Sequence, residues 1–206
     1  MDTLNSQHLT PQDGYIHVFR RPGEFTYSAP VLEYDGGFQT GRIVVAGDPA
    51  PEGKGQQHDV VLSWDIEARQ FASRDSDAAT TIRPNDFVVF HFGVAVHGQP
   101  PCFILIRQQD KIEADSRRLK THDVFTHFFF RPGEYSYRLG KSRYQISVAD
   151  HRSISEKESK KQSKSPLMIT VRGNDVSVPH GRIVAGQSAV WFIEQGEGIH
   201  IDGTLG

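Results

Sequence analysis

Residues 17–27 read HVFRRPGEFTY, and residues 127–137 repeat them as HFFFRPGEYSY. The match includes an Arg-Pro-Gly-Glu segment followed by alternating aromatic residues, and Asp13 and Asp123 fall in the same register. A match of this length is not expected by chance, and a repeat has to be settled before local structure is assigned. It indicates two structural units of the same kind within the chain.

Each copy of the repeat has the pattern of two extended segments joined by a turn. Pro-Gly favours a type II turn, because proline presets φ at the second position and glycine tolerates a positive φ at the third. The flanking residues are aromatic, β-branched or alternating, which is typical of strands. The sequence therefore predicts a strand, a tight hairpin turn and a second strand in each copy.

The repeated turn motif is also a candidate site. Its arginines and glutamates can pair across the turn, Arg21 with Glu24 and Arg131 with Glu134, in contacts worth under ~1 kcal/mol when exposed. A ligand-binding role used twice is the alternative interpretation. The motif comprises Arg21, Pro22, Gly23, Glu24, Arg131, Pro132, Gly133 and Glu134.

A second, weaker repeat relates residues 82–90 to residues 183–191, each a tight turn followed by an apolar strand. Another strand candidate precedes each copy, at residues 60–64 and 167–171. The order of these elements along the chain bears on how they group into domains.

The middle of the chain contains a complete set of elements, whereas each end contains part of one. Neither end could close a sandwich alone, because a sheet edge and an apolar face would be left open to water. The sequence therefore predicts one continuous unit at 57–150 and a second unit, circularly permuted, from 1–50 plus 166–206. Exchange of these pieces between two subunits would satisfy the same requirement. Residues 151–165 lack apolar periodicity and are expected to be a flexible linker.

Composition limits the functional classes. The 206 residues are 37% hydrophobic, and a net charge of −2 gives no overall field for nucleic acid or an anionic membrane. The single Cys102 cannot form an internal disulfide, and we expect it to be a small, partly buried side chain. No basic and apolar leader starts the sequence and no apolar run could span a bilayer, so a cytoplasmic location is expected, or a periplasmic one if a signal was removed.

Three segments resemble the cupredoxin fold of plastocyanin and its relatives. They are the turn and apolar strand at 85–90, the Pro-Gly-x-aromatic-x-aromatic strand at 132–137, and the Gly-x-Ile-Val-Val strand at 41–45. The resemblance implies an all-β chain built from two Greek-key β-sandwich units of cupredoxin type.

The resemblance also implies where a blue copper ion would be held, by one early His and by Cys, His and Met on the loop after the aromatic strand. The corresponding stretches, 28–42 and 138–145, contain no His, Cys or Met. The early His alone has counterparts, at His97 and His200. One imidazole does not hold a metal, so we expect no type 1 copper and no cofactor.

Ten histidines leave a different metal site to be considered. His91, His97, His122 and His127 fall in one predicted unit and could converge on zinc or non-blue copper. No spacing matches a known zinc motif, which favours separate structural histidines. His17 and His127 share one repeat position, which suggests a shared packing or hydrogen-bonding role instead of catalysis. The candidate metal ligands are His97, His200, His91 and His127.

No arrangement specific for catalysis is present: there is no Gly-x-Ser-x-Gly elbow, no phosphate loop and no dinucleotide fingerprint. Three alternatives follow. The first is a non-catalytic cupredoxin-like binding or assembly module for an unknown protein or small ligand, with a homodimer among the compatible assemblies. The second is a metal-binding protein that uses a histidine cluster. The third is a cofactor-free enzyme with an unidentified site. Neither nucleic acid nor a membrane span is expected.

Overall fold

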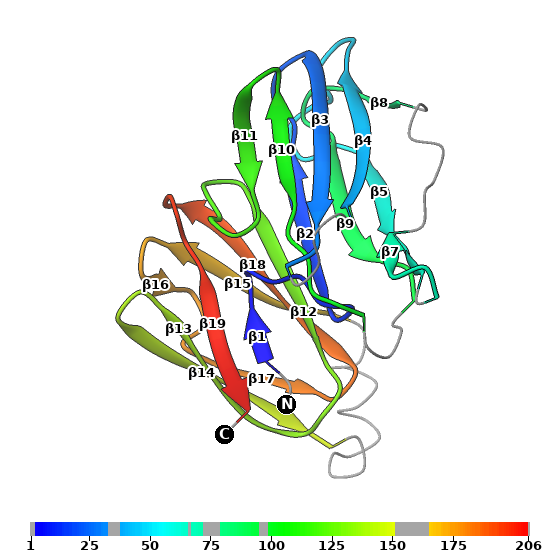
Figure 1. Cartoon of the computed structure of the whole chain (residues 1–206). Helices are drawn as coiled ribbons and strands as arrows, with labels where there is room; N and C mark the ends of the chain where they lie inside the picture. Colours follow the sequence, from blue (N-terminus) through cyan, green and yellow to red (C-terminus); the bar gives the residue numbers. More distant parts are fainter. Residues whose placement is uncertain are drawn as a thin grey trace. The chain divides into compact units, whose positions relative to one another are not determined.

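The computed structural model of the chain describes residues 3–32, 38–65, 67–71, 79–94, 99–150 and 165–205 (Figure 1). Within these ranges the regular secondary structure consists of β-strands, with no helix, which confirms the all-β class. Since these ranges hold no helix, they hold none that could cross a membrane. His97 and residues 151–164 of the predicted linker lie outside the described residues.

The chain divides into two compact units. Unit A is His8–Arg118, and unit B combines Met1–Gln7 with Leu119–Gly206. These boundaries differ from the predicted 57–150 and 1–50 plus 166–206. The strands around the first Pro-Gly repeat, Asp13–Val18 and Phe38–Val45, pair with Phe87–Phe92 and Thr80–Ile82, which follow them in the chain. The strands around the second repeat, Val124–Phe129 and Ser142–Ala149, pair with Gln187–Gln195 and His180–Val184, which also follow them and do not precede them. Because both copies carry the same apolar pattern, that pattern does not specify which copy a strand pairs with.

Unit A contains two main sheets and a short ribbon. One sheet has the order β2-β9-β5, the other β11-β10-β3-β4-β8, and β6 pairs with β7. The pairs β5–β9 and β4–β8 are parallel, whereas the other pairs are antiparallel. The strands are β2 (Asp13–Val18), β3 (Gly23–Pro30), β4 (Phe38–Val45), β5 (Gln57–Leu62), β6 (Trp64–Asp65), β7 (Gln70–Phe71), β8 (Thr80–Ile82), β9 (Phe87–Phe92), β10 (Leu105–Gln108) and β11 (Lys111–Asp115).

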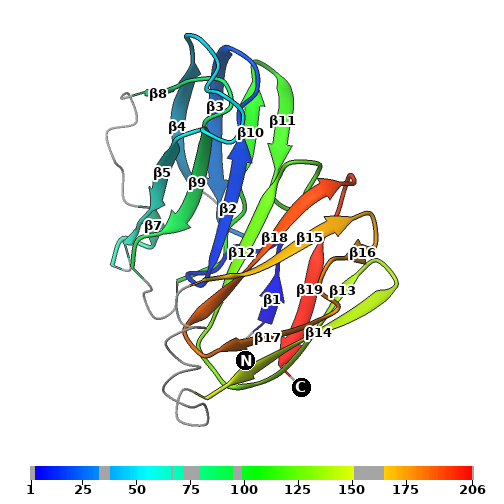
Figure 2. The same cartoon turned by 180° about the vertical axis from the view of Figure 1, so that it is seen from behind.

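Unit B has the same order of pairing. One sheet runs β16-β15-β18-β12 (Figure 2) and the other β1-β19-β13-β14-β17. Parallel pairs recur at the equivalent places, β15–β18 and β14–β17. The strands are β1 (Thr3–Asn5), β12 (Val124–Phe129), β13 (Gly133–Leu139), β14 (Ser142–Ala149), β15 (Leu167–Arg172), β16 (Asp175–Val176), β17 (His180–Val184), β18 (Gln187–Gln195) and β19 (Ile201–Leu205).

The edge strand of unit B comes from the start of the chain. β1 pairs with β19, as β11 pairs with β10 in unit A. Ser6 follows β1, and its backbone N–H donates a hydrogen bond to the Ile201 carbonyl. The Ser6 hydroxyl accepts a second hydrogen bond, from the Ile201 N–H, at 2.9 Å. Ser116, after β11, makes the same two contacts with Ile104. Both serines are fully buried, so the edge strand is fixed identically in the two units.

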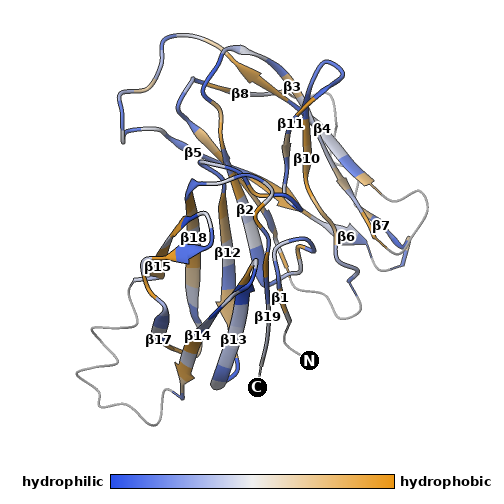
Figure 3. Cartoon of the chain, turned by 90° about the vertical axis from the view of Figure 1, so that its left-hand side faces the viewer, coloured by the Kyte–Doolittle hydropathy of each residue, from blue (hydrophilic) through white to orange (hydrophobic). Residues whose placement is uncertain are grey.

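Aromatic residues fill the space between the two sheets of each unit. In unit A, Tyr27 of β3 meets Phe90 of β9 edge-on at 5.3 Å between ring centroids. In unit B, Tyr137 of β13 meets Trp191 of β18 edge-on at 5.5 Å. Apolar residues, orange in Figure 3, lie along the strands of both units. Two opposed sheets with a shared apolar core follow from these contacts.

The Pro-Gly turns do not form the predicted hairpins. β2 and β3 lie in different sheets of unit A, and β12 and β13 lie in different sheets of unit B. Each turn therefore carries the chain from one sheet to the other. Gly23 and Gly133 adopt φ of 152° and 150°, at the edge of the region that favours glycine.

Candidate functional site

Charged residues of the repeated turn motif have partners outside the motif. Arg21 contacts Glu113 at 3.4 Å, and Glu24 contacts Arg42 at 3.3 Å. In the second copy the Glu134 carboxylate accepts a hydrogen bond from the Ser147 hydroxyl. Partners on neighbouring strands are available to these side chains because the motif changes sheets instead of folding back on itself.

The motif retains a packing role in both units. The Arg131 carbonyl accepts a hydrogen bond from the Tyr135 hydroxyl at 3.0 Å. Pro22 and Pro132 precede the glycines of the two sheet crossings. A β-carbon on Gly23 would lie 2.2 Å from Nε2 of Gln108, so the crossing brings the backbone close to β10. These contacts position strands.

The candidate metal ligands are divided between the units. His91 lies on β9 in unit A, whereas His127 on β12 and His200 before β19 belong to unit B. The predicted grouping of His91, His122 and His127 in one unit therefore differs from the structure. Within the described part of the chain, no group of three or more His, Cys, Asp or Glu side chains could hold a metal ion.

His91 and His127 contact residues on their own or adjacent strands. His91 Nε2 lies 3.4 Å from an Asp59 carboxylate oxygen, and its Nδ1 lies 3.1 Å from the Phe92 carbonyl. His127 is 1% exposed and meets Phe129 edge-on at 4.6 Å, as His17 meets Phe19 at 4.9 Å. The shared aromatic contact supports packing as the role of this repeat position.

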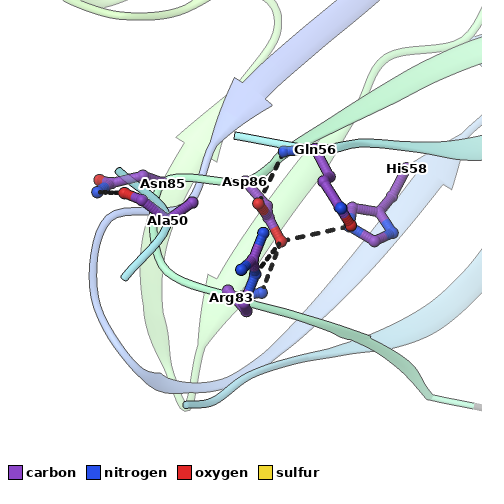
Figure 4. A network of polar contacts seen from close by, with 6 residues as sticks. All are labelled: Ala50, Gln56, His58, Arg83, Asn85 and Asp86. Carbon is purple, nitrogen blue, oxygen red and sulfur yellow. Dashed lines mark hydrogen bonds and ion pairs between the residues drawn. The ribbon is translucent and has the colours of Figure 1, made fainter. Parts of the chain in front are cut away.

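A buried carboxylate in unit A, that of Asp86, is the centre of a network of polar contacts (Figure 4). The Asp86 side chain is 2% exposed and accepts backbone hydrogen bonds from Gln56 at 2.8 Å and Arg83 at 2.9 Å. His58 Nε2 and Arg83 Nε lie 3.4 Å and 3.7 Å from it. Burial by itself raises the pKa of Asp86, but these hydrogen bonds and the Arg83 charge outweigh it and lower the pKa below its usual value.

The equivalent position in unit B shows what this site does. Gln187 accepts a hydrogen bond from the Val184 N–H at 2.7 Å and donates one to the Ser165 carbonyl at 3.3 Å. A neutral amide thus bridges the same turn and the same incoming strand as the Asp86 carboxylate. The shared bridging contact gives Asp86 a structural role, the joining of its own turn to the incoming strand.

Sequence reasoning placed a turn before an apolar strand here but did not find the buried carboxylate. An Asp can close its own turn when its side chain accepts a hydrogen bond from the backbone N–H of the residue three positions earlier. An Asp at the end of a predicted turn is the sequence signal for this contact. Asp86 and Arg83 have this spacing.

Exposed apolar side chains gather on the outer face of one unit B sheet. Phe128, Phe130 and Met168 are 45%, 60% and 56% exposed, and the two phenylalanine rings stack at 6.3 Å. Val190 and Phe192 of β18 lie half-buried on the same face, with Met168 directly opposite Val190. These five residues are called the apolar face below.

Unit A has different chemistry at the equivalent positions. The strand registers match Phe128 with Val18, Met168 with Asp59, and Phe192 with His91, and the repeat matches Phe130 with Arg20. Arg20, Asp59 and His91 make that surface more polar, whereas Val18 keeps one position apolar. The fold therefore does not require the large apolar side chains that unit B exposes.

Cys102 is fully buried and forms isolated antiparallel β-bridges with Leu9 and with Val31. Burial raises the pKa of its thiol, and the negative charge of Asp13 adds to the effect. A protonated, enclosed thiol is neither a nucleophile nor a metal ligand.

Comparisons were made with protein-family models, curated proteins and solved structures. None matches this chain. Its function is therefore inferred from its own surface.

Proposed function

We propose that this chain is a non-catalytic assembly module of cupredoxin-like type without type 1 copper, and that its apolar face binds a second copy of the chain. The two units are an internal duplication of one Greek-key sandwich, and unit B, which combines both ends of the chain, is circularly permuted relative to unit A. The matching strand orders, with parallel pairs at equivalent places, support this assignment.

The observation that carries the proposal is the difference between two surfaces built on the same scaffold. Phe128, Phe130 and Met168 expose apolar area at a cost of ~25 cal/mol for each Å² kept in water. Unit A folds with Val18, Arg20 and Asp59 in their place. Contact with another apolar surface gives these side chains a role that folding does not.

The charges at the end of the apolar face favour a second copy as the occupant. Arg172 and Glu194 lie on the same sheet face, 2.8 Å apart and 66% and 41% exposed. A two-fold contact places the same patch on both partners, so each arginine can meet the other copy's glutamate. A net charge of only −2 opposes self-association weakly.

Sedimentation equilibrium of the full chain tests the proposal. The wild type is expected to form a dimer, and the double variant Phe128→Val/Phe130→Arg, which installs the chemistry of unit A, is expected to dissociate at least tenfold more readily. Ile112→Thr removes an apolar side chain that is 50% exposed in unit A and is the matched control. A wild type that is monomeric at its highest soluble concentration overturns the second-copy assignment, as does a dimer that the double variant leaves unchanged.

A further inference from the structure

A hollow lies on the outer face of the five-stranded sheet of unit A, over β10, β3 and β4. Its position is separate from the apolar face, which belongs to unit B, so an inference from it does not depend on the proposed assembly. The lining consists of Thr26, Tyr27, Ser28, Thr40, Gly41, Arg42, Leu105 and Arg107.

The strand register brings two arginines to one row of this surface. Arg107 of β10 lies opposite Thr26 of β3, and Thr26 lies opposite Arg42 of β4. Neighbouring strands are ~4.8 Å apart, so the two arginine backbones are separated by about 10 Å with the threonine between them. Arginine side chains are long enough for both guanidinium groups to reach a common point above Thr26.

The next row supplies further hydrogen-bond donors. Ser28 lies between Leu105 and Thr40, one pleat along from Thr26. The hollow thus combines two guanidinium groups with the hydroxyls of Thr26, Ser28 and Thr40. None of its lining residues carries a carboxylate.

The charge of this hollow is only partly neutralised. Arg107 has no side-chain hydrogen bond or ion pair with the residues that the structure describes. Arg42 contacts Glu24 at 3.3 Å, and both side chains are at least half exposed. An exposed ion pair of this kind is weak and is readily exchanged for another anion.

The carboxylates on the adjacent strand β11 are held by other arginines. Asp115 accepts two hydrogen bonds from the Arg117 guanidinium, at 2.9 and 2.7 Å. Burial by itself raises the pKa of Asp115, but these hydrogen bonds outweigh burial and lower the pKa below its usual value. Glu113 contacts Arg21 at 3.4 Å. These acids therefore do not compensate Arg107.

We propose that this hollow binds a tetrahedral dianion, a phosphate or sulfate group, between Arg42 and Arg107 with the three hydroxyls as additional donors. Guanidinium groups match such oxyanions in geometry and charge. Several donors converging from different strands suit a group with oxygens in three directions better than a planar carboxylate. The same chemistry is supplied by free inorganic anions and by phosphate or sulfate esters.

Unit B provides a natural control, because it lacks both arginines at the equivalent positions. The registers match Arg42 with Gln145, Thr26 with Ser136, and Arg107 with Thr204. Replacing each arginine by its unit B counterpart keeps a residue that this sheet position accepts. Arg42→Gln and Arg107→Thr are therefore the variants of choice.

Isothermal titration of the full chain at low ionic strength tests the site, with inorganic phosphate and inorganic sulfate in one arm and phenyl phosphate in the other. Saturable binding of one anion per chain is expected, weakened at least tenfold by Arg42→Gln and by Arg107→Thr and unchanged by the control Arg138→Ser in unit B. Glu24→Gln is expected to tighten binding severalfold, since it removes the competing carboxylate from Arg42.

The two arms separate the sources of the anion. Tighter binding of phenyl phosphate than of inorganic phosphate supports an ester ligand, and the reverse supports a free anion. Absence of saturable binding in both arms overturns the proposal. Binding that neither arginine variant weakens also overturns it, because the anion would then be held elsewhere.

Discussion

The Asp86 network offers the sharpest test of how unit A is held together. Replacing Asp86 by Ala removes the acceptor for two backbone N–H groups, those of Gln56 and Arg83, which bonded to it at 2.8 and 2.9 Å. An orphaned buried donor costs ~1–3 kcal/mol, and hydrogen bonds to a charged group are at the upper end. We expect Asp86→Ala to lower the free energy of unfolding of unit A by about 2–6 kcal/mol.

Urea unfolding followed by circular dichroism measures this loss, and hydrogen exchange with mass spectrometry assigns it to a unit. Peptides from β5, β8 and β9 are expected to lose protection, whereas peptides from β15, β17 and β18 keep theirs. Asp59→Ala is the control, because that carboxylate is 45% exposed and its contacts, with His91 and Gln57, are on the protein surface. We expect it to cost less than ~1 kcal/mol.

The pH dependence provides a second, independent measure. Because the folded pKa of Asp86 is below its ordinary value of 3.8, the ionised carboxylate stabilises the fold at pH values above about 4. That stabilisation is lost as the pH falls through the folded pKa. The difference between wild type and Asp86→Ala should therefore be constant near neutrality and shrink in acid. A cost below ~1 kcal/mol at pH 7, or one that acid leaves unchanged, would refute the reasoning.

Two further predictions concern unit A. Burial raises the pKa of the Cys102 thiol, so an aromatic disulfide reagent should react with it only as the unit opens. Labelling should therefore accelerate with urea, and rapid labelling of the folded chain would contradict the burial of Cys102. Gly41→Ala should lower stability by ~1–3 kcal/mol in urea unfolding, because the new β-carbon would lie 2.5 Å from the Tyr27 ring; an unchanged midpoint would show that the ring moves aside freely.

Local sequence patterns predicted the class of structure well. Alternation around Phe25 and Tyr27, and around Tyr135 and Tyr137, placed strands that the structure confirms as β3 and β13. The hairpin prediction was wrong, because Pro-Gly specifies a change of direction but not whether the next strand pairs with the last. Pairing depends on which sheet offers a free edge, and that is a property of the whole unit.

The surface features were harder to predict. Three consecutive phenylalanines, Phe128 to Phe130, cannot all face one core in a strand of period two, so the quoted repeat already contained the signal for the apolar face. The two arginines of the hollow are 65 positions apart, counting from Arg42 to Arg107, and only the strand register brings them together. The capping role of Asp86 likewise depends on Gln56, which the turn pattern does not identify.

The edge strand of unit B has a consequence for biosynthesis. Ser6 and its partner Ile201 are 195 residues apart, with the whole of unit A between them. At ~5–20 residues per second, a ribosome needs roughly 10–40 s to make the second after the first. Unit A can fold during that interval from residues already made. β1 leaves the ribosome before every strand of unit A and is thus among the last strands of this pair of units to find its place. The nascent chain must keep Leu4 and Ser6 from mispairing until translation reaches β19.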